Sequence, residues 1–217
     1  MSKPGAYTRA DVVDTALRLL DKYGLADLSM RRLAAELDVQ PSALYWHVPN
    51  KQTLLALVSD QIIGRAVVVD HAAHDADGTP DWKTVTLAEA TSIRDALLAF
   101  RDGAEVVSST LALGLGADAA LERIREGIDL VCEDAEIARV TAESILFLVL
   151  GQVWHEQQRM QADSLGVVSP SVAADPAKVE RFASADSGVA REQISSFEFG
   201  VELILVGLEN RMASQAG

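Results

Sequence analysis

The apolar residues of this chain recur at the three- and four-residue intervals of an α-helix, and no segment alternates convincingly as a β-strand would. Proline and glycine, which interrupt helices, are sparse inside the segments that show this spacing. Beyond the first 70 residues, those segments are 84–101, 104–114, 118–133, 136–161 and 192–213. The pattern predicts an all-α fold.

Two stretches of different composition suggest how the chain is organised. The run DHAAHDADGTP at residues 70–80 has low complexity and ends in turn-forming residues. We expect it to separate a small domain, residues 1–70, from a larger helical domain, residues 71–217. A second stretch, residues 163–188, is rich in Ser, Ala, Asp and Pro, which predicts a long loop.

Helix start and stop signals divide the first domain further. Thr8 opens a capping-box-like start for a first helix, and Gly24 stands where that helix would end. Ser29 is a suitable cap for a short second helix that stops near residues 38–39. Pro41 suits the first turn of a third helix.

Pro49 limits the third helix, because a proline disfavours helical geometry in the residue before it. We therefore expect this helix to have only about two turns. Asn50 is positioned to cap a fourth helix, which begins at Lys51. A short turn between the second and third helices is the arrangement of a helix-turn-helix, whose second helix enters the DNA major groove.

Net charge alone would argue against a nucleic-acid partner. The chain of 217 residues carries a formal charge of −13, whereas nucleic-acid-binding domains are usually basic. The acidity is uneven, however: residues 1–70 hold 8 Lys and Arg against 8 Asp and Glu, and residues 71–217 hold 11 against 24. A neutral first part is compatible with a face that contacts phosphates, while the acidic remainder would repel DNA.

Several features favour a soluble cytoplasmic protein. The start MSKPGAYTR lacks the apolar segment of a secretory signal, and no apolar run approaches the roughly 18 residues of a membrane span. Cys132 is the only cysteine, which excludes an intrachain disulfide and a multi-cysteine zinc site. We expect it to be a buried, small apolar residue. His71 and His74 are three residues apart, but we expect neither a metal nor a cofactor.

Side chains around the predicted helix-turn-helix can recognise DNA. Arg31 can bind guanine or phosphate, and polar groups of Ser42, Tyr45 and His47 can bond phosphates or base edges. Pro41, Ala43 and the Tyr45 ring can contact a thymine methyl. Lys51, in the first turn of a helix, suits a phosphate. Singly, each residue is more often a solvated charge or a structural side chain; together, within about twenty residues, they favour DNA contact.

These residues carry a family resemblance. LSMRRLAAELDVQPSALYWHVPNKQTLLALV, residues 28–58, resembles the DNA-binding segment of the tetracycline-repressor family, and LYWHVPNK is its most specific part. DALLAFRDGAEVV at 95–107 and GVELILVGLENRM at 200–212 are similar to segments of the tetracycline repressor's own C-terminal domain. The resemblance implies a homodimeric repressor in which an N-terminal three-helix unit binds a palindromic operator. The helical body then dimerises and binds a small effector that releases DNA.

Carried onto this chain, the resemblance places the following residues at DNA-facing positions: Arg31, Pro41, Ser42, Ala43, Tyr45, Trp46, His47 and Lys51. Met30 and Ala43 stand where the tetracycline repressor has hydroxyl residues, so a changed base preference is expected. Its histidine and asparagine ligands for drug and magnesium correspond here to Val67, Val107 and Glu89, and Ile93 replaces a pocket aromatic. A valine cannot ligate magnesium, which argues against tetracycline as effector.

Two further sets of residues are implied by the resemblance. Gln152, Trp154 and His155 lie on a helix that lines the family's pocket, and a role in the core or an interface is an equal alternative. On the last helix, one broad apolar face is expected to form a two-fold four-helix interface: Phe197, Val201, Ile204, Leu205 and Leu208. Gly200 and Gly207 would allow close helix approach.

The sequence thus predicts a ligand-responsive DNA-binding regulator, most simply a homodimeric repressor. One alternative is an all-helical enzyme whose first helices merely pack, although no acid–base or nucleophile constellation is visible. Another is a DNA-bound architectural or activator protein without an effector.

Overall fold

The computed structural model describes residues 7–67, 81–116, 118–166 and 195–215. Across these residues the regular structure is entirely α-helical, so the predicted fold class is confirmed. The expected domain boundary at 70–80, with His71 and His74, lies outside the described residues, as does most of the loop expected at 163–188. Residues 163 and 164 differ from expectation, because they continue a helix.

Four helices form the N-terminal unit: α1 (Arg9–Tyr23), α2 (Met30–Glu36), α3 (Pro41–Leu44) and α4 (Lys51–Ile63). The predicted caps are confirmed. The Thr8 hydroxyl accepts a hydrogen bond from the Asp11 amide (3.2 Å), and the Asp11 carboxylate accepts one from the Thr8 amide (2.8 Å). The hydroxyl and the amide of Thr8 both donate to the Asp11 carboxylate, and this lowers the pKa of Asp11. Ser29 and Asn50 likewise accept bonds from the first turns of α2 and α4.

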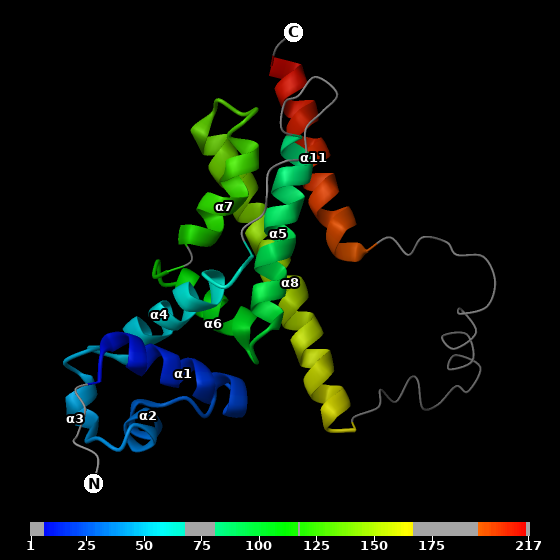
Figure 1. Cartoon of the computed structure of the whole chain (residues 1–217). Coiled ribbons are helices and arrows are strands. Elements are labelled where there is room, and N and C mark those ends of the chain that lie inside the picture. The colour runs from blue at the N-terminus through cyan, green and yellow to red at the C-terminus, as the bar shows by residue number, and fades with distance from the viewer. Residues whose placement is uncertain (1–6, 68–80, 117, 167–194, 216–217) are drawn as a thin grey trace.

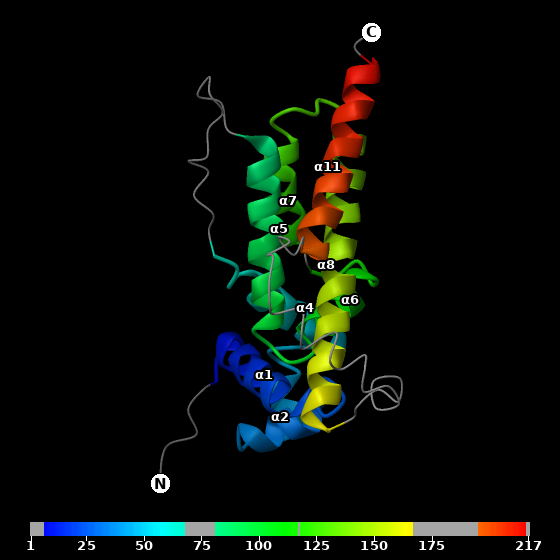
Figure 2. The ribbon, with the colours of Figure 1, turned by 90° about the vertical axis from the view of Figure 1, so that its right-hand side faces the viewer.

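The body contains α5 (Trp82–Leu98), α6 (Gly103–Leu111), α7 (Asp118–Ile128), α8 (Ala135–Ser164) and α11 (Ser196–Gln215). Helices α5, α7, α8 and α11 run alongside one another, with α1, α2 and α3 gathered at one end of this bundle and the C-terminus at the other (Figures 1 and 2). Helix α4 connects the two parts, since it packs on α1 as well as on α5, α6 and α7. One apolar core runs through both parts, and it includes Cys132.

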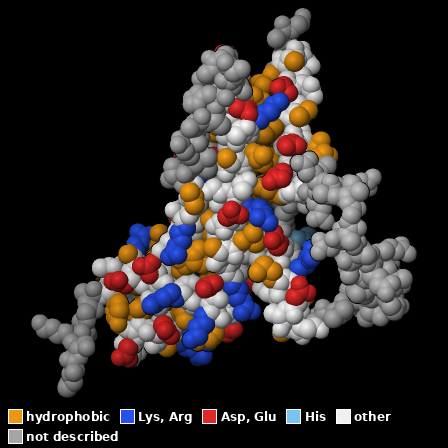
Figure 3. Space-filling view, turned by 45° about the vertical axis from the view of Figure 1, so that its right-hand side comes forward, with side chains coloured by type: hydrophobic (Ala, Val, Ile, Leu, Met, Phe, Trp, Pro, Cys, Tyr) orange, Lys and Arg blue, Asp and Glu red, His pale blue; other side chains and the backbone are white. Residues whose placement is uncertain are grey.

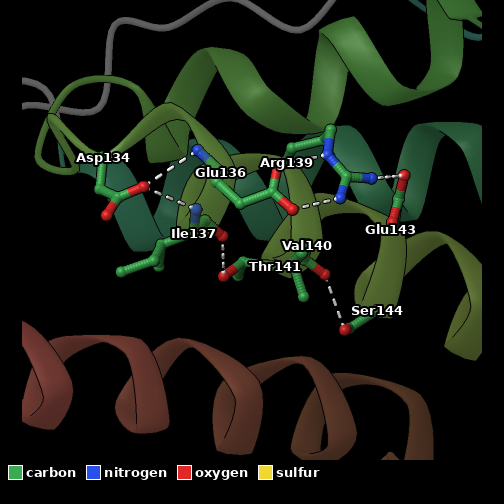
Figure 4. A network of polar contacts seen from close by, with 8 residues as sticks. All are labelled: Asp134, Glu136, Ile137, Arg139, Val140, Thr141, Glu143 and Ser144. Carbon is green, nitrogen blue, oxygen red and sulfur yellow. Dashed lines mark hydrogen bonds and ion pairs between the residues drawn. The ribbon is translucent and has the colours of Figure 1, made fainter.

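Helix α8 is the central element of the body. By length and composition it could cross a membrane, although Glu143 interrupts its apolar residues. Here it packs against α5, α6, α7 and α11, which is the environment of a core helix in a helical bundle. Its start is polar (Figure 4): Asp134 caps it, and the guanidinium of Arg139 lies between Glu136 and Glu143 and lowers the pKa of Glu136.

A carboxylate joins the N-terminal unit to the body. Asp102, in the turn before α6, accepts hydrogen bonds from the Leu25 amide (2.8 Å) and from the Gln161 side chain of α8 (2.6 Å). Gly24 lies so close that a Cβ atom there would come within 2.7 Å of the Asp102 carboxylate. Gly24 also has a φ of 84°, which L residues rarely adopt. The end of α1 is therefore held directly against the body.

Candidate nucleic-acid interface and effector-binding body

The third helix is shorter than the sequence predicts. Helix α3 ends at Leu44, one turn after it begins, and residues 45–47 form a turn instead. The amides of His47 (2.9 Å) and Val48 (2.8 Å) both donate to the Leu44 carbonyl, which closes a single turn that does not continue the helix. Pro49, which disfavours helical geometry at Val48, sets only the outer limit of this segment. The expectation of about two turns was wrong.

The side chains of this turn face in opposite directions. Leu44 and Val48 are buried and anchor the segment to the core of the N-terminal unit. Tyr45 is 52% exposed and Trp46 is 91% exposed, while His47 is half-buried. Burial of large aromatic surface is a main source of folding free energy, so an exposed Trp46 is not explained by stability.

The other predicted DNA-facing residues surround this turn. Arg31, Pro41, Ser42 and Ala43 are exposed, and Lys51 is half-buried at the first position of α4. Their common exposure is compatible with one contact surface formed by α2, α3 and the start of α4.

The two adjacent arginines of α2 have different environments. Arg32 pairs with Asp27 (2.8 Å) and stacks over the Tyr23 ring (3.9 Å), so it joins α2 to the end of α1. Arg31 makes no ion pair within the described part of the chain. Its guanidinium is therefore the one of the pair that is available to an external anion.

Charge is mixed over the N-terminal unit. Figure 3 shows Lys and Arg side chains gathered at the lower end of the molecule, where α1 to α4 lie, with Asp and Glu side chains among them. This agrees with the neutral balance of residues 1–70 and contrasts with the acidic remainder. Such a protein would be attracted to DNA only at this end.

The residues expected in an effector pocket do not line a single hollow. Glu89, Ile93 and Val107 are buried in the core, whereas Val67, four residues after the end of α4, is 74% exposed. Val67 contributes to a hollow along α5. On α8, Gln152 and His155 line a groove beside the start of α11, and Trp154 lines another beside α6.

The hollow along α5 has a volume of about 560 Å³. Its walls are mostly small or apolar side chains, among them Val67, Leu87, Ala88, Thr91, Ser92 and Ala96. Pockets of about 300–1,000 Å³ with such walls and a few polar groups are typical of small-molecule sites. In the described residues no group of three or more His, Cys, Asp or Glu is arranged to hold a metal ion.

Sequence reasoning missed the partner of Glu89. Arg123 of α7 forms a short ion pair with it, at 2.6 Å, although both positions lie on inward faces of their helices. Arg123 is three residues after buried Ala120, and Glu89 is three residues after buried Thr86. Opposite charges at two such core-facing positions were the signal that could have revealed the pair.

The expected dimer face of α11 requires a correction. Phe197, Val201, Leu205 and Leu208 are buried within the single chain, where α11 packs on α8 and α5, and only Ile204 is half-buried. The apolar side chains that remain exposed are Phe199, Leu203 and Val206. Both faces of α11 are apolar, and periodicity could not show which one the chain uses for itself.

The two glycines of α11 also differ. A Cβ atom at Gly200 would lie 2.9 Å from the Leu148 side chain of α8, so the close approach expected there occurs within the chain. A Cβ atom at Gly207 would meet open space among the described residues. Helix α8 exposes Val140, Phe147 and Trp154 at seven-residue intervals, along one line.

Comparison with known proteins identifies relatives over both parts of the chain. Residues 12–58 match the family described as bacterial regulatory proteins, tetR family, and residues 75–212 match the tetracyclin repressor-like C-terminal domain. The tetracycline repressor protein class E of Escherichia coli is 31% identical over 205 residues, which cover 93% of this chain and 90% of that protein.

Two solved structures show similar folds at comparable identity. BioQ with its double-stranded DNA operator is 32% identical, with a TM-score of 0.69, and the match covers 93% of this chain and 98% of BioQ. ActR of Streptomyces coelicolor in complex with (S)-DNPA is 29% identical, with a TM-score of 0.67, covering 94% and 98%.

Proposed function

Because the chain belongs to the tetR family of bacterial regulatory proteins, we propose that it binds an operator duplex through α2, α3 and the start of α4 and releases it when a small molecule binds the body. A ligand-responsive DNA-binding regulator is the function that its relatives support. BioQ binds a DNA operator and ActR binds a small molecule. We transfer these two kinds of partner, and not their identities.

The DNA-binding part of this proposal rests on the turn after α3. Tyr45 and Trp46 are exposed there, while Leu44 and Val48 fix the backbone from inside. Rigid support behind exposed polar and aromatic groups suits recognition in a groove, where phosphate contacts fix position and base contacts fix sequence. The proposed contact residues are Arg31, Pro41, Ser42, Ala43, Tyr45, Trp46, His47 and Lys51.

For the effector, we favour the hollow along α5. Its wall includes Arg65 and Val67, at the end of α4, so a ligand there would touch the connection to the N-terminal unit. The mostly apolar wall suits a small, largely apolar molecule with one or two polar groups. Such a ligand shifts the equilibrium only as far as its affinities for the two arrangements of the protein differ.

Dimerisation is proposed through the exposed apolar side chains of α8 and α11. Phe147 of α8 and Phe199 and Leu203 of α11 are exposed on helices that pack on each other. Exposed apolar side chains on two adjacent helices are typical of an interface. A two-fold arrangement would present two N-terminal units to a palindromic duplex, with half-sites about 34–36 Å apart or a multiple of this.

Selection of DNA from a randomised duplex library by the purified full-length protein tests the proposal. We expect an enriched palindromic sequence that is bound with a strong dependence on salt concentration. Native mass spectrometry of the same preparation would identify a small molecule that co-purifies in the body. Failure to enrich any sequence, at low as well as physiological salt, would contradict operator binding.

A further inference from the structure

One arginine of the body contacts the backbone just after α4, the last helix of the N-terminal unit. Arg123 of α7 donates from Nη1 to the Ala66 carbonyl (3.1 Å) and from Nη2 to the Val67 carbonyl (2.7 Å). The hydroxyl of Ser92, on α5, donates to the same Val67 carbonyl at 2.7 Å. We call Arg123, Glu89, Ser92 and the carbonyls of Ala66 and Val67 the Arg123 cluster.

The arginine is itself held in place by Glu89. Its Nε donates to the Glu89 carboxylate at 2.7 Å, and its Nη2 lies 2.6 Å from the same oxygen. The side chains are 19% and 3% exposed, respectively. Solvent screens such a pair far less than a surface pair, and the planar guanidinium fixes the direction of each remaining N–H.

The chemistry of the contacted carbonyls explains why a cation is placed there. Helix α4 ends at Ile63, and the amides of Arg65 and Ala66 continue its hydrogen bonding back to Ile62 and Ile63. The carbonyls of Ala66 and Val67 lie just beyond these turns, and they accept from the Arg123 guanidinium. Hydrogen bonds from a charged donor are stronger than those between neutral groups, so Arg123 fixes the backbone that leaves α4.

This cluster connects three elements at the junction between the two parts of the molecule. Helices α5 and α7 belong to the body, whereas α4 packs on α1 and leads into the N-terminal unit. Movement of the end of α4 relative to the body would break two charge-assisted hydrogen bonds from Arg123 and a hydrogen bond from Ser92 together. Ser92 and Val67 also line the hollow along α5, so the contents of that hollow and the state of the cluster are physically linked.

We propose that Arg123 is a positioning residue that holds the end of α4 against the body and thereby fixes the spacing of the two N-terminal units on a palindromic duplex. This inference rests on the proposed function. It assigns the coupling between the body and the N-terminal unit to one guanidinium, and Arg123 is not among the proposed DNA-contact residues. Loss of Arg123 leaves each N-terminal unit intact but loosens the end of α4 against the body.

The test uses Arg123→Met combined with Glu89→Gln in the full-length protein, because removal of one charge alone would leave its partner buried and unpaired. The matched control is Arg125→Met on the same helix, since Arg125 pairs with Asp129 at the surface. Thermal unfolding establishes that each variant is folded. If the double variant does not fold, Arg123→Lys keeps the charge but cannot supply the same fork of donors, and it is measured in the same way.

Two measurements distinguish a loss of coupling between the body and the N-terminal unit from a general loss of stability. Amide hydrogen exchange should accelerate in the peptide covering residues 60–67 of the double variant and remain unchanged in the control. Affinity for the duplex selected by the wild-type protein should fall by about tenfold, within the usual range of coupling between sites. Affinity for a duplex containing one half-site should not change.

The outcomes are distinguishable. Faster local exchange with loss of affinity only for the full site supports the proposal. Unchanged exchange and affinity, or equal losses on full and half-sites, overturn it. If the wild-type protein enriches no duplex, the proposed function has failed, and the exchange experiment still reports whether Arg123 restrains α4.

Discussion

At the scale of single residues, the turn after α3 combines buried and exposed side chains. Leu44 and Val48 are buried, and Tyr45 and Trp46 between them are exposed. A helix places neighbouring side chains about 100° apart, so a short helix followed by a turn can anchor on one side and present the other. The aromatic side chains here therefore cost little stability to replace, and their loss should be felt in binding.

We expect Tyr45→Ala and Lys51→Ala each to weaken binding to the selected duplex without lowering the midpoint of thermal unfolding by more than a few degrees. A lost phosphate contact at Lys51 should lower the affinity for all duplex sequences to a similar extent. It should also reduce, by about one, the slope of the logarithm of the binding constant against the logarithm of salt concentration. Loss of Tyr45 should cost roughly 1–3 kcal/mol if it reads a base edge. Fluorescence anisotropy over a range of salt concentrations measures both.

Lys83→Ala is the matched control for the lysine, because Lys83 pairs with Glu209 at the far end of the body. Its affinity and salt slope should equal those of the wild-type protein. Wild-type affinity in both Tyr45→Ala and Lys51→Ala would show that the contact surface has been assigned to the wrong face.

At the scale of elements, the contact between the end of α1 and the body rests on the carboxylate of Asp102. It accepts from the Leu25 amide and from Gln161, and its own φ is 56°, a conformation that aspartate tolerates better than alanine. Asp102→Ala should therefore lower the free energy of unfolding by about 1–3 kcal/mol, mainly through the unpaired amide. Urea denaturation measures this, with Asp129→Ala as the surface control.

Gly24 offers an internal check on that interpretation. A Cβ atom at residue 24 would come within 2.7 Å of the Asp102 carboxylate. The cost of Gly24→Ala should thus be smaller in the Asp102→Ala background than alone, and the difference measures the contact. Simple additivity of the two changes would mean that only the backbone conformation of Gly24 matters.

Most helices could be predicted from the sequence because their signals are local. Thr8, Ser29 and Asn50 cap the helices that their spacing predicted, since a cap depends only on the next three residues. The length of α3 was overestimated, because Pro49 gives only an outer limit for the helix and residues 45–47 form a turn instead. The DNA-facing set also comes from local sequence, as its members lie within about twenty residues, and it stays a prediction.

Features that depend on distant packing could not be predicted in the same way. The apolar residues of α11 were recognised, but four of the five assigned to an interface are buried against α8 and α5. Arg123 and Glu89 are 34 residues apart in sequence, and only the packing of α7 on α5 brings them together. Helical periodicity gives the faces of a helix and leaves open which neighbour each face meets.

At the scale of the whole molecule, the corrected apolar surface of α8 and α11 determines how two chains can combine. Phe147 and Phe199 are exposed on helices that pack on each other, and the same helices also expose Val140, Trp154, Leu203 and Val206. A two-fold interface buries the same patch on both chains, so a charge introduced there meets its own copy. One substitution on each helix should therefore be enough to prevent association.

We expect Phe147→Arg combined with Phe199→Arg to sediment as a monomer at concentrations where the wild-type protein is a dimer. Because two linked units gain about 10²–10⁴ in avidity, affinity for the full palindrome should fall by at least about a hundredfold. Affinity for one half-site should be retained, since α3 lies with α1 and α2 at one end of the bundle and carries neither substitution. Leu113→Arg, at an exposed position after α6, is the matched control and should remain dimeric. A double variant that still sediments as a dimer would place the interface elsewhere. The two N-terminal units, whose spacing Arg123 is proposed to fix, would then be arranged differently in the dimer.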